Sequence, residues 1–207
     1  MKNKTILFSL IALIACSCHF ETHGEYDGAW YSESFIDGYL IPQEIRISDS
    51  TKNEFRFEGI YLSGEAKEKI KKKCGDTTYK SMLVSPNDGI VTDFHRIEIT
   101  SNIDFDSEHK AGELLNDIAM FHGKSAWKFI QAGCPKEQED ILYRYGYWPI
   151  DKLASEITGE DLILLHPDFS IQFAKQPENP GTYLINIAFI GDGITIEKDM
   201  EMTFGND

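Results

Sequence analysis

The strongest structural signal in this chain is a β-hairpin near its C-terminus. Residues 183–190 read YLINIAFI, a nearly unbroken apolar run, as is typical of a strand buried on both faces. The pair Asp192-Gly193 then suits a two-residue type I′ turn. The returning strand carries apolar side chains at Ile194, Ile196, Met200, Met202 and Phe204. Their alternation breaks near Lys198-Asp199, where we predict a bulge. A chain with such a hairpin has to fold around a β-sheet core.

Three further regions alternate apolar and polar residues with the period of a half-buried strand. Ile41–Ile47 is separated from Phe55–Tyr61 by a polar turn at residues 49–53, which predicts an antiparallel hairpin. Ile97 and Ile99 alternate with polar neighbours, and so do Phe169, Ile171 and Phe173. The regular spacing of turns between such segments favours a β-sandwich or a barrel.

Two short helices are expected between the strands. One begins after Ser63 and ends at Gly75, with Glu65 in its first turn and lysines towards its C-terminus, as helix capping and the helix dipole favour. The other has helical spacing over Leu114–Phe121. Residues 126–132 are expected to form another strand.

We therefore predict one mainly-β domain over residues 27–207, an antiparallel β-sandwich with two short helices. The alternative is a lipocalin-like barrel, because Gly28-Ala29-Trp30 is similar to the opening of lipocalin-type barrels. The same three residues also fit a strand start at which Trp30 fills the core.

The first sixteen residues have the pattern of an export signal. Lys2 and Lys4 precede an apolar run over residues 6–15, which is too short to span a bilayer. The run ends in Leu13-Ile14-Ala15-Cys16, which resembles the lipobox of bacterial lipoproteins. This resemblance implies a signal peptide over residues 1–15, lipid on Cys16, a lipidated tether over residues 16–26, and attachment to a membrane through the lipid.

Charge and cysteine content limit the remaining possibilities. The net charge of −14 repels phosphate backbones, so we exclude nucleic-acid binding. An exported protein can form disulfides, and with Cys16 lipidated and Cys18 in the tether, the candidate pair is Cys74–Cys134. Closing that loop of about 60 residues would stabilise the fold by about 4 kcal/mol. Two free thiols are the alternative.

Two segments resemble Bacteroidetes lipoproteins: the first resembles the central segment of an uncharacterised family, and the second resembles the closing hairpin of many β-sandwich lipoproteins from the same bacteria. One is Ile97–Phe121, in which a strand runs into an acidic and aromatic loop, an Ala-Gly step and a short helix. The other is Pro180-Gly181-Thr182-Tyr183 with the hairpin that follows. The resemblance implies a β-sandwich of Ig-like character in the cell envelope, at the outer membrane, and implies no activity.

The acidic loop within the first of these segments is a candidate calcium site. Its oxygen-bearing side chains fall at the offsets by which a calcium loop supplies its ligands; they belong to Asn102, Asp104, Asp106, Glu108 and Glu113. Ser107 stands where such loops have glycine. The other interpretation is a solvated acidic loop that caps the next helix.

An aromatic strand is the second candidate site. Tyr143, Tyr145 and Tyr147 would share one face of a strand, with Trp148 opposite, and such a platform could stack on the sugar rings of a glycan. Cross-strand aromatic packing is the other interpretation.

The motifs that signal catalysis are missing from the sequence. The chain has no HExxH motif and no Gly-x-Ser-x-Gly elbow. We therefore expect a non-catalytic binding or accessory module of the envelope, with a protein partner or a glycan as its ligand and no cofactor other than calcium. The alternatives are a lipocalin-like carrier of a small apolar ligand and an envelope hydrolase. A hydrolase would require two carboxylates, or a nucleophile and a base, converging in one cleft.

Overall fold

The computed structural model describes residues 30–49, 53–83, 85–135 and 147–205. The predictions for the signal peptide, Cys16, the tether, Tyr143 and Tyr145 lie outside these residues. The described chain is mainly β, as predicted, and its strands form two larger sheets and one small one. None of its described helices is both long and apolar enough to cross a membrane.

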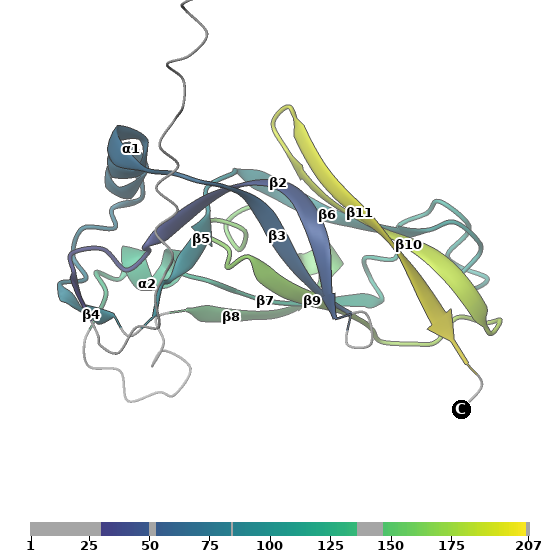
Figure 1. The fold of residues 1–207 in the computed structure, drawn as a ribbon. Coiled ribbons are helices and arrows are strands. Elements are labelled where there is room, and N and C mark those ends of the chain that lie inside the picture. The colour runs from purple at the N-terminus through teal and green to yellow at the C-terminus, as the bar shows by residue number, and fades with distance from the viewer. Residues whose placement is uncertain (1–29, 50–52, 84, 136–146, 206–207) are drawn as a thin grey trace, which may run out of the picture.

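The larger sheet has six strands in the order β5-β2-β3-β9-β7-β8. Its pairings are antiparallel except for the parallel pair β2–β5. The sheet curls, so that it resembles half of a barrel (Figure 1). Its strands are β2 (Gly38–Asp49), β3 (Glu54–Tyr61), β5 (Asp88–Ile90), β7 (Ala119–Ser125), β8 (Trp148–Leu153) and β9 (Asp168–Phe173).

The second sheet has the order β11-β10-β6, and β11 lies beside β2 of the first sheet. It consists of β6 (Phe94–Ser101), β10 (Gly181–Gly191) and β11 (Ile194–Phe204). The small sheet pairs β1 (Trp30–Ser32) with β4 (Ser81–Leu83). It lies at the end of the molecule that carries the helices α1 (Gly64–Cys74) and α2 (Trp127–Gln131), and the C-terminus lies at the other end (Figure 1).

Aromatic side chains fill the space between the two larger sheets. Phe189 of β10 lies edge-on to Phe57 of β3, with ring centroids 4.8 Å apart, and edge-on to Phe169 of β9 at 5.1 Å. Phe94 and Phe121 contact the same ring. The main hydrophobic cluster therefore includes residues of both sheets, consistent with a β-sandwich, while the curl of the six-stranded sheet also fits the barrel alternative.

Several predicted elements are confirmed. β2 and β3 form the expected antiparallel hairpin. Helix α1 begins after Ser63 and ends at Gly75, whose φ of 73° is the left-handed conformation that glycine tolerates best. The C-terminal hairpin pairs β10 with β11 across Asp192-Gly193.

The details of that hairpin differ from the prediction. The β10–β11 register runs without a shift, so the bulge predicted near Lys198-Asp199 is wrong. Only Gly193 of the turn pair has a positive φ, whereas a type I′ turn needs one at both residues. β10 is also not buried on both faces, because Leu184 is 37% exposed while its neighbours Tyr183 and Ile185 face the core.

Two helix and strand predictions are wrong, and tertiary contacts explain both. The helix expected over 114–121 is a turn followed by β7. There the Asn116 side chain accepts a hydrogen bond from Ile99 N (2.9 Å) and donates one to Ile97 O (2.7 Å), which binds the turn to β6. The strand expected over 126–132 is the helix α2, with Phe129 and Ile130 buried in a second apolar cluster.

Candidate functional site

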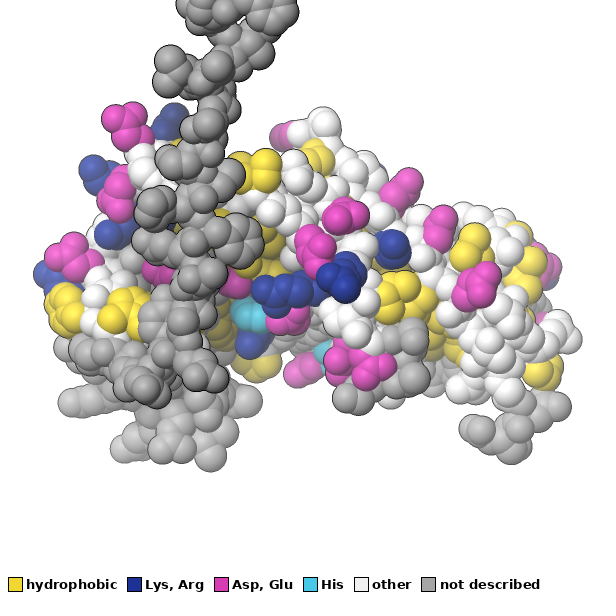
Figure 2. Space-filling view, viewed as in Figure 1, with side chains coloured by type: hydrophobic (Ala, Val, Ile, Leu, Met, Phe, Trp, Pro, Cys, Tyr) yellow, Lys and Arg dark blue, Asp and Glu magenta, His cyan; other side chains and the backbone are white. Residues whose placement is uncertain are grey.

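The six-stranded sheet has one face turned away from the three-stranded sheet, and this outer face carries charged and hydroxyl-bearing side chains. Strand alternation sends Phe55, Phe57 and Phe169 to the core and their neighbours outward. We call this surface the outer face; its central residues are Glu54, Arg56, His122, Lys124, Asp151, Asp168 and Ser170. Figure 2 shows basic, acidic and histidine side chains gathered over its middle.

Arg56 is the centre of a fixed hydrogen-bond network on the outer face. One guanidinium nitrogen donates to both oxygens of Asp168, at 2.7 and 2.8 Å, and another lies 3.3 Å from Asp88 Oδ2. The Tyr61 hydroxyl donates to the same Asp88 oxygen at 2.9 Å. Contacts of two guanidinium nitrogens with two carboxylates restrict the orientation of Arg56, and the shared Asp88 oxygen holds the Tyr61 hydroxyl beside it.

Burial perturbs several groups around this network. It raises the pKa of Tyr61 to about 12, with the Asp88 carboxylate adding to the shift, and it raises the pKa of Asp88. It also lowers the pKa of His166 to about 4, helped by the charge of Lys124. Neutral His166 then accepts a hydrogen bond at Nδ1 from Asp168 N, 3.2 Å away. Such clusters of shifted pKa values are frequent at functional sites.

A pocket adjoins the network on the outer face. Its volume is about 200 Å³, and its lining includes Ser48, Glu54, His122, Asp168 and Ser170. His122 Nδ1 lies 2.7 Å from Asp151 Oδ1 on the neighbouring strand. A histidine oriented by a carboxylate beside a hydroxyl is an arrangement that can move protons.

The predicted calcium loop does not gather its ligands around a site. Its carboxylates instead accept hydrogen bonds within the loop: Asp106 Oδ1 from Glu108 N and His109 N, and Asp104 Oδ1 from Ala111 N. Asn102 Oδ1 accepts from Leu184 N, and Glu113 Oε2 from Lys110 N. In the described part of the chain no three His, Cys, Asp or Glu side chains are arranged to hold a metal ion.

Two lysines form ion pairs with carboxylates of this loop. Lys175 Nζ lies 2.8 Å from Asp106 Oδ2, and Lys110 Nζ lies 3.2 Å from Asp104 Oδ2. The hydrogen bond from Lys175 holds the pKa of Asp106 well below its usual range. The hydrogen bonds from His109 lower this pKa further, and burial acts to raise it. The loop is therefore closed by ion pairs, which spacing alone could not distinguish from a metal site.

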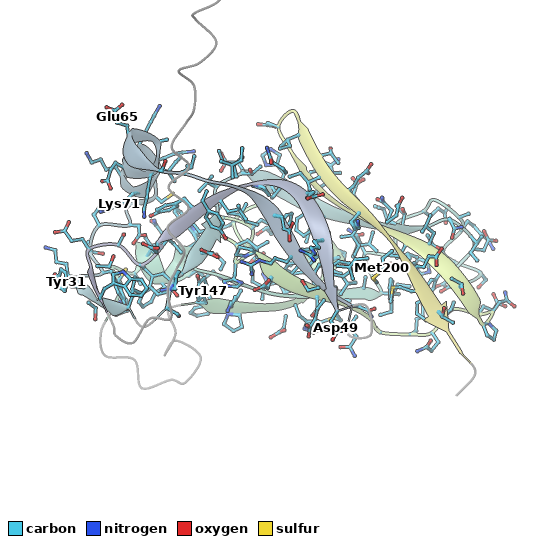
Figure 3. The ribbon with its side chains drawn as sticks, in the orientation of Figure 1. Tyr31, Asp49, Glu65, Lys71, Tyr147 and Met200 are labelled. Atoms are coloured by element: carbon cyan, nitrogen blue, oxygen red, sulfur yellow. The ribbon has the colours of Figure 1, made fainter. Side chains whose placement is uncertain are left out.

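Only Tyr147 and Trp148 of the predicted aromatic platform lie among the described residues, so the platform stays a prediction. Tyr147 is buried in the second apolar cluster, donates its hydroxyl to Asp88 O at 2.8 Å and lies edge-on to Phe35. It lies at the end of the molecule that carries α1 and α2 (Figure 3). Trp148, whose ring is contacted by Lys128, begins β8. Tyr147 therefore contributes to aromatic packing in the protein interior, which was the other interpretation of this segment.

Cys74 and Cys134 are free thiols, so the disulfide predicted between them is not formed in this structure. Both belong to the second apolar cluster, Cys134 as a buried member and Cys74 packed against it. Burial raises the pKa of the Cys134 thiol to about 11, which disfavours the reactive thiolate.

No local sequence pattern identifies the outer face. Alternation in β3, β7 and β9 does indicate which side chains point outward, but the lateral order of the strands decides which of them meet. The chain matches no protein-family model, no curated protein and no solved structure.

Proposed function

We propose that the protein is a binding or accessory module of the cell envelope, attached by lipid on Cys16 to the outer membrane, and that its outer face binds a protein partner. The lipobox-like leader supports the anchor, and the two facing sheets support an Ig-like β-sandwich. Aromatic side chains fill the space between the sheets. A carrier of apolar ligands would need a cavity there, so this packing supports a binding module more than it supports a carrier.

The observation that carries this proposal is the preorganised pair of Arg56 and Tyr61. Arginine and tyrosine dominate the binding energy of protein interfaces, and side chains already fixed lose little entropy on binding. The adjoining ends of β2 and β3 expose Ile41 and Ile60, 38% and 55% exposed, which pair across the two strands. Apolar side chains beside oriented Tyr and Arg, surrounded by charges of both signs, fit the composition of a protein interface.

The test is a pull-down from gently solubilised envelopes, with the tag at Asp207 and mass spectrometry of the proteins recovered. We expect a stoichiometric partner. Tyr61→Ala should reduce its recovery about tenfold, because truncating an interface anchor typically costs more than 1 kcal/mol. Leu184→Ala, on the exposed side of β10, is the matched control and should leave recovery unchanged.

Two outcomes would reject the proposed partner binding. Recovery of the tagged protein alone would direct the search to glycans, and equal losses with Tyr61→Ala and Leu184→Ala would show that the outer face is not the interface. Mass spectrometry of the purified protein tests the anchor separately, since lipid on Cys16 adds the mass of its acyl chains.

A further inference from the structure

A hydroxyl, an imidazole and a carboxylate stand side by side on the outer face. The strand registers place Ser170 of β9 opposite His122 of β7, and His122 opposite Asp151 of β8. Directly opposed residues of antiparallel strands have Cβ atoms about 4.5–5.5 Å apart on the same face. His122 is thus flanked by a hydroxyl on one side and by a carboxylate on the other.

The hydrogen bond to Asp151 fixes which nitrogen of His122 can act as a base. An ionised carboxylate only accepts, so in a neutral ring the proton is on Nδ1, which lies 2.7 Å from Asp151 Oδ1. Nε2 is then the bare acceptor. It is covered by the protein and has no hydrogen-bond partner among the described residues. A covered acceptor without a partner is costly. The Ser170 hydroxyl belongs to the residue directly opposite on β9 and does not bond to Nε2 in this structure, so side-chain rotation has to bring the two groups together.

The surroundings of this row suit attack on a carbonyl group. Ser170 and His122 both line the pocket of about 200 Å³, in which a short acyl chain has room. Arg56 stands one register row further along, diagonal to Ser170 on β3, within the reach of long side chains. Its guanidinium is paired with Asp168 and Asp88, so it can stabilise a developing oxyanion through its remaining N–H groups.

We propose that Ser170, His122 and Asp151 form a nucleophilic site that hydrolyses short-chain esters. Ser170 Oγ attacks the ester carbonyl carbon and its proton passes to His122 Nε2. The ester C–O bond then breaks, and the alcohol leaves with that proton. Water next attacks the acyl-serine, giving one proton to Nε2; the carboxylic acid is released and Ser170 Oγ recovers its proton. Asp151 is a positioning residue that orients the ring. This activity goes beyond the proposed binding function and departs from the expectation of a non-catalytic module.

The test is covalent labelling of the purified full chain with a fluorophosphonate probe, with the labelled residue mapped by mass spectrometry. We expect one label on Ser170, because the displaced fluoride leaves a stable phosphonyl-serine. His122→Ala should slow labelling at least about 100-fold, the usual loss on removing a general base. Ser107→Ala removes an exposed hydroxyl of the loop between β6 and β7, which does not line the pocket, and should label at the wild-type rate.

Asp151→Asn separates positioning from structural support. It keeps the side-chain size but not the charge, so it should slow labelling and lower the pH at which the labelling rate reaches half its maximum, because the lost carboxylate no longer stabilises the protonated ring. Thermal unfolding of each variant verifies that it is folded. The proposal is overturned if the wild-type chain takes no label, if the label persists in Ser170→Ala, or if folded His122→Ala labels as fast as wild type. Since the pull-down requires no labelling, either result can fail without the other.

Discussion

At the scale of single residues, Asp76 shows how one polar side chain can hold two distant segments of the chain together. It is fully buried and accepts hydrogen bonds from Phe35 N (2.7 Å), Ile36 N (2.8 Å) and the Tyr39 hydroxyl (2.7 Å). Burial raises its pKa, and these three donors act in the opposite direction. The bonds attach the chain before β2 to the end of α1.

Removing this carboxylate should destabilise the fold strongly. Asp76→Ala leaves two buried amides and one buried hydroxyl without partners, and we expect a loss of about 3 kcal/mol or more in the free energy of unfolding. Urea denaturation measures the loss. Asp37→Ala, which breaks a partly exposed ion pair with Lys67, is the control and should cost less than about 1 kcal/mol. Equal losses in the two variants would contradict this account of Asp76.

At the scale of elements, the loop between β6 and β7 is held by a buried histidine. His109 Nδ1 lies 2.8 Å from Asp106 Oδ1, and its Nε2 lies 3.0 Å from Asp117 Oδ1. Burial acts to lower the pKa of His109, but the bonds to the two carboxylates outweigh it, so the pKa is raised. The loop is therefore most stable when His109 is charged.

The sign of the pH dependence follows from that shift. A histidine whose pKa is higher in the folded chain than the unfolded value of about 6.5 contributes stability that is fully present below that value. The contribution is lost as the pH rises through the folded pKa. Wild type and His109→Gln should therefore differ more in unfolding free energy at about pH 5.5 than at about pH 8.5.

Urea denaturation at both pH values tests this expectation. His95→Gln is the control, because His95 pairs with Asp192 at the surface and exposed pairs contribute less than about 1 kcal/mol. A His109→Gln loss that is the same at both pH values, or greater at the higher one, would show that His109 does not hold the loop as a charged group.

These elements also show why the sequence predicts only part of the structure. The β2–β3 hairpin and α1 were predictable because alternation, a turn and a C-terminal glycine are all local signals. The Leu114–Phe121 segment has helical spacing, but its turn is fixed by Asn116 contacts to β6 that no local pattern encodes. The candidate site was hidden for the same reason, since His122, Asp151 and Ser170 become neighbours only through strand order.

At the scale of the whole molecule, the two larger sheets depend on each other through aromatic contacts. Phe189 is fully buried, and its ring meets Phe57, Phe121 and Phe169 of the opposite sheet. Neither sheet can bury its inner face alone, so we expect the described fold to unfold as one cooperative unit.

Phe189→Ala tests that dependence, since it opens a cavity where the sheets meet. We expect a loss of about 3–5 kcal/mol in unfolding free energy, and less than about 1.5 kcal/mol for Phe189→Leu, which keeps most of the volume. Leu184→Ala, on the same strand but exposed, should cost little. Tryptophan fluorescence and far-ultraviolet circular dichroism should give coincident urea transitions in wild type. Separate transitions would mean that the sheets unfold independently, and the core would then not be the single structure that supports the outer face.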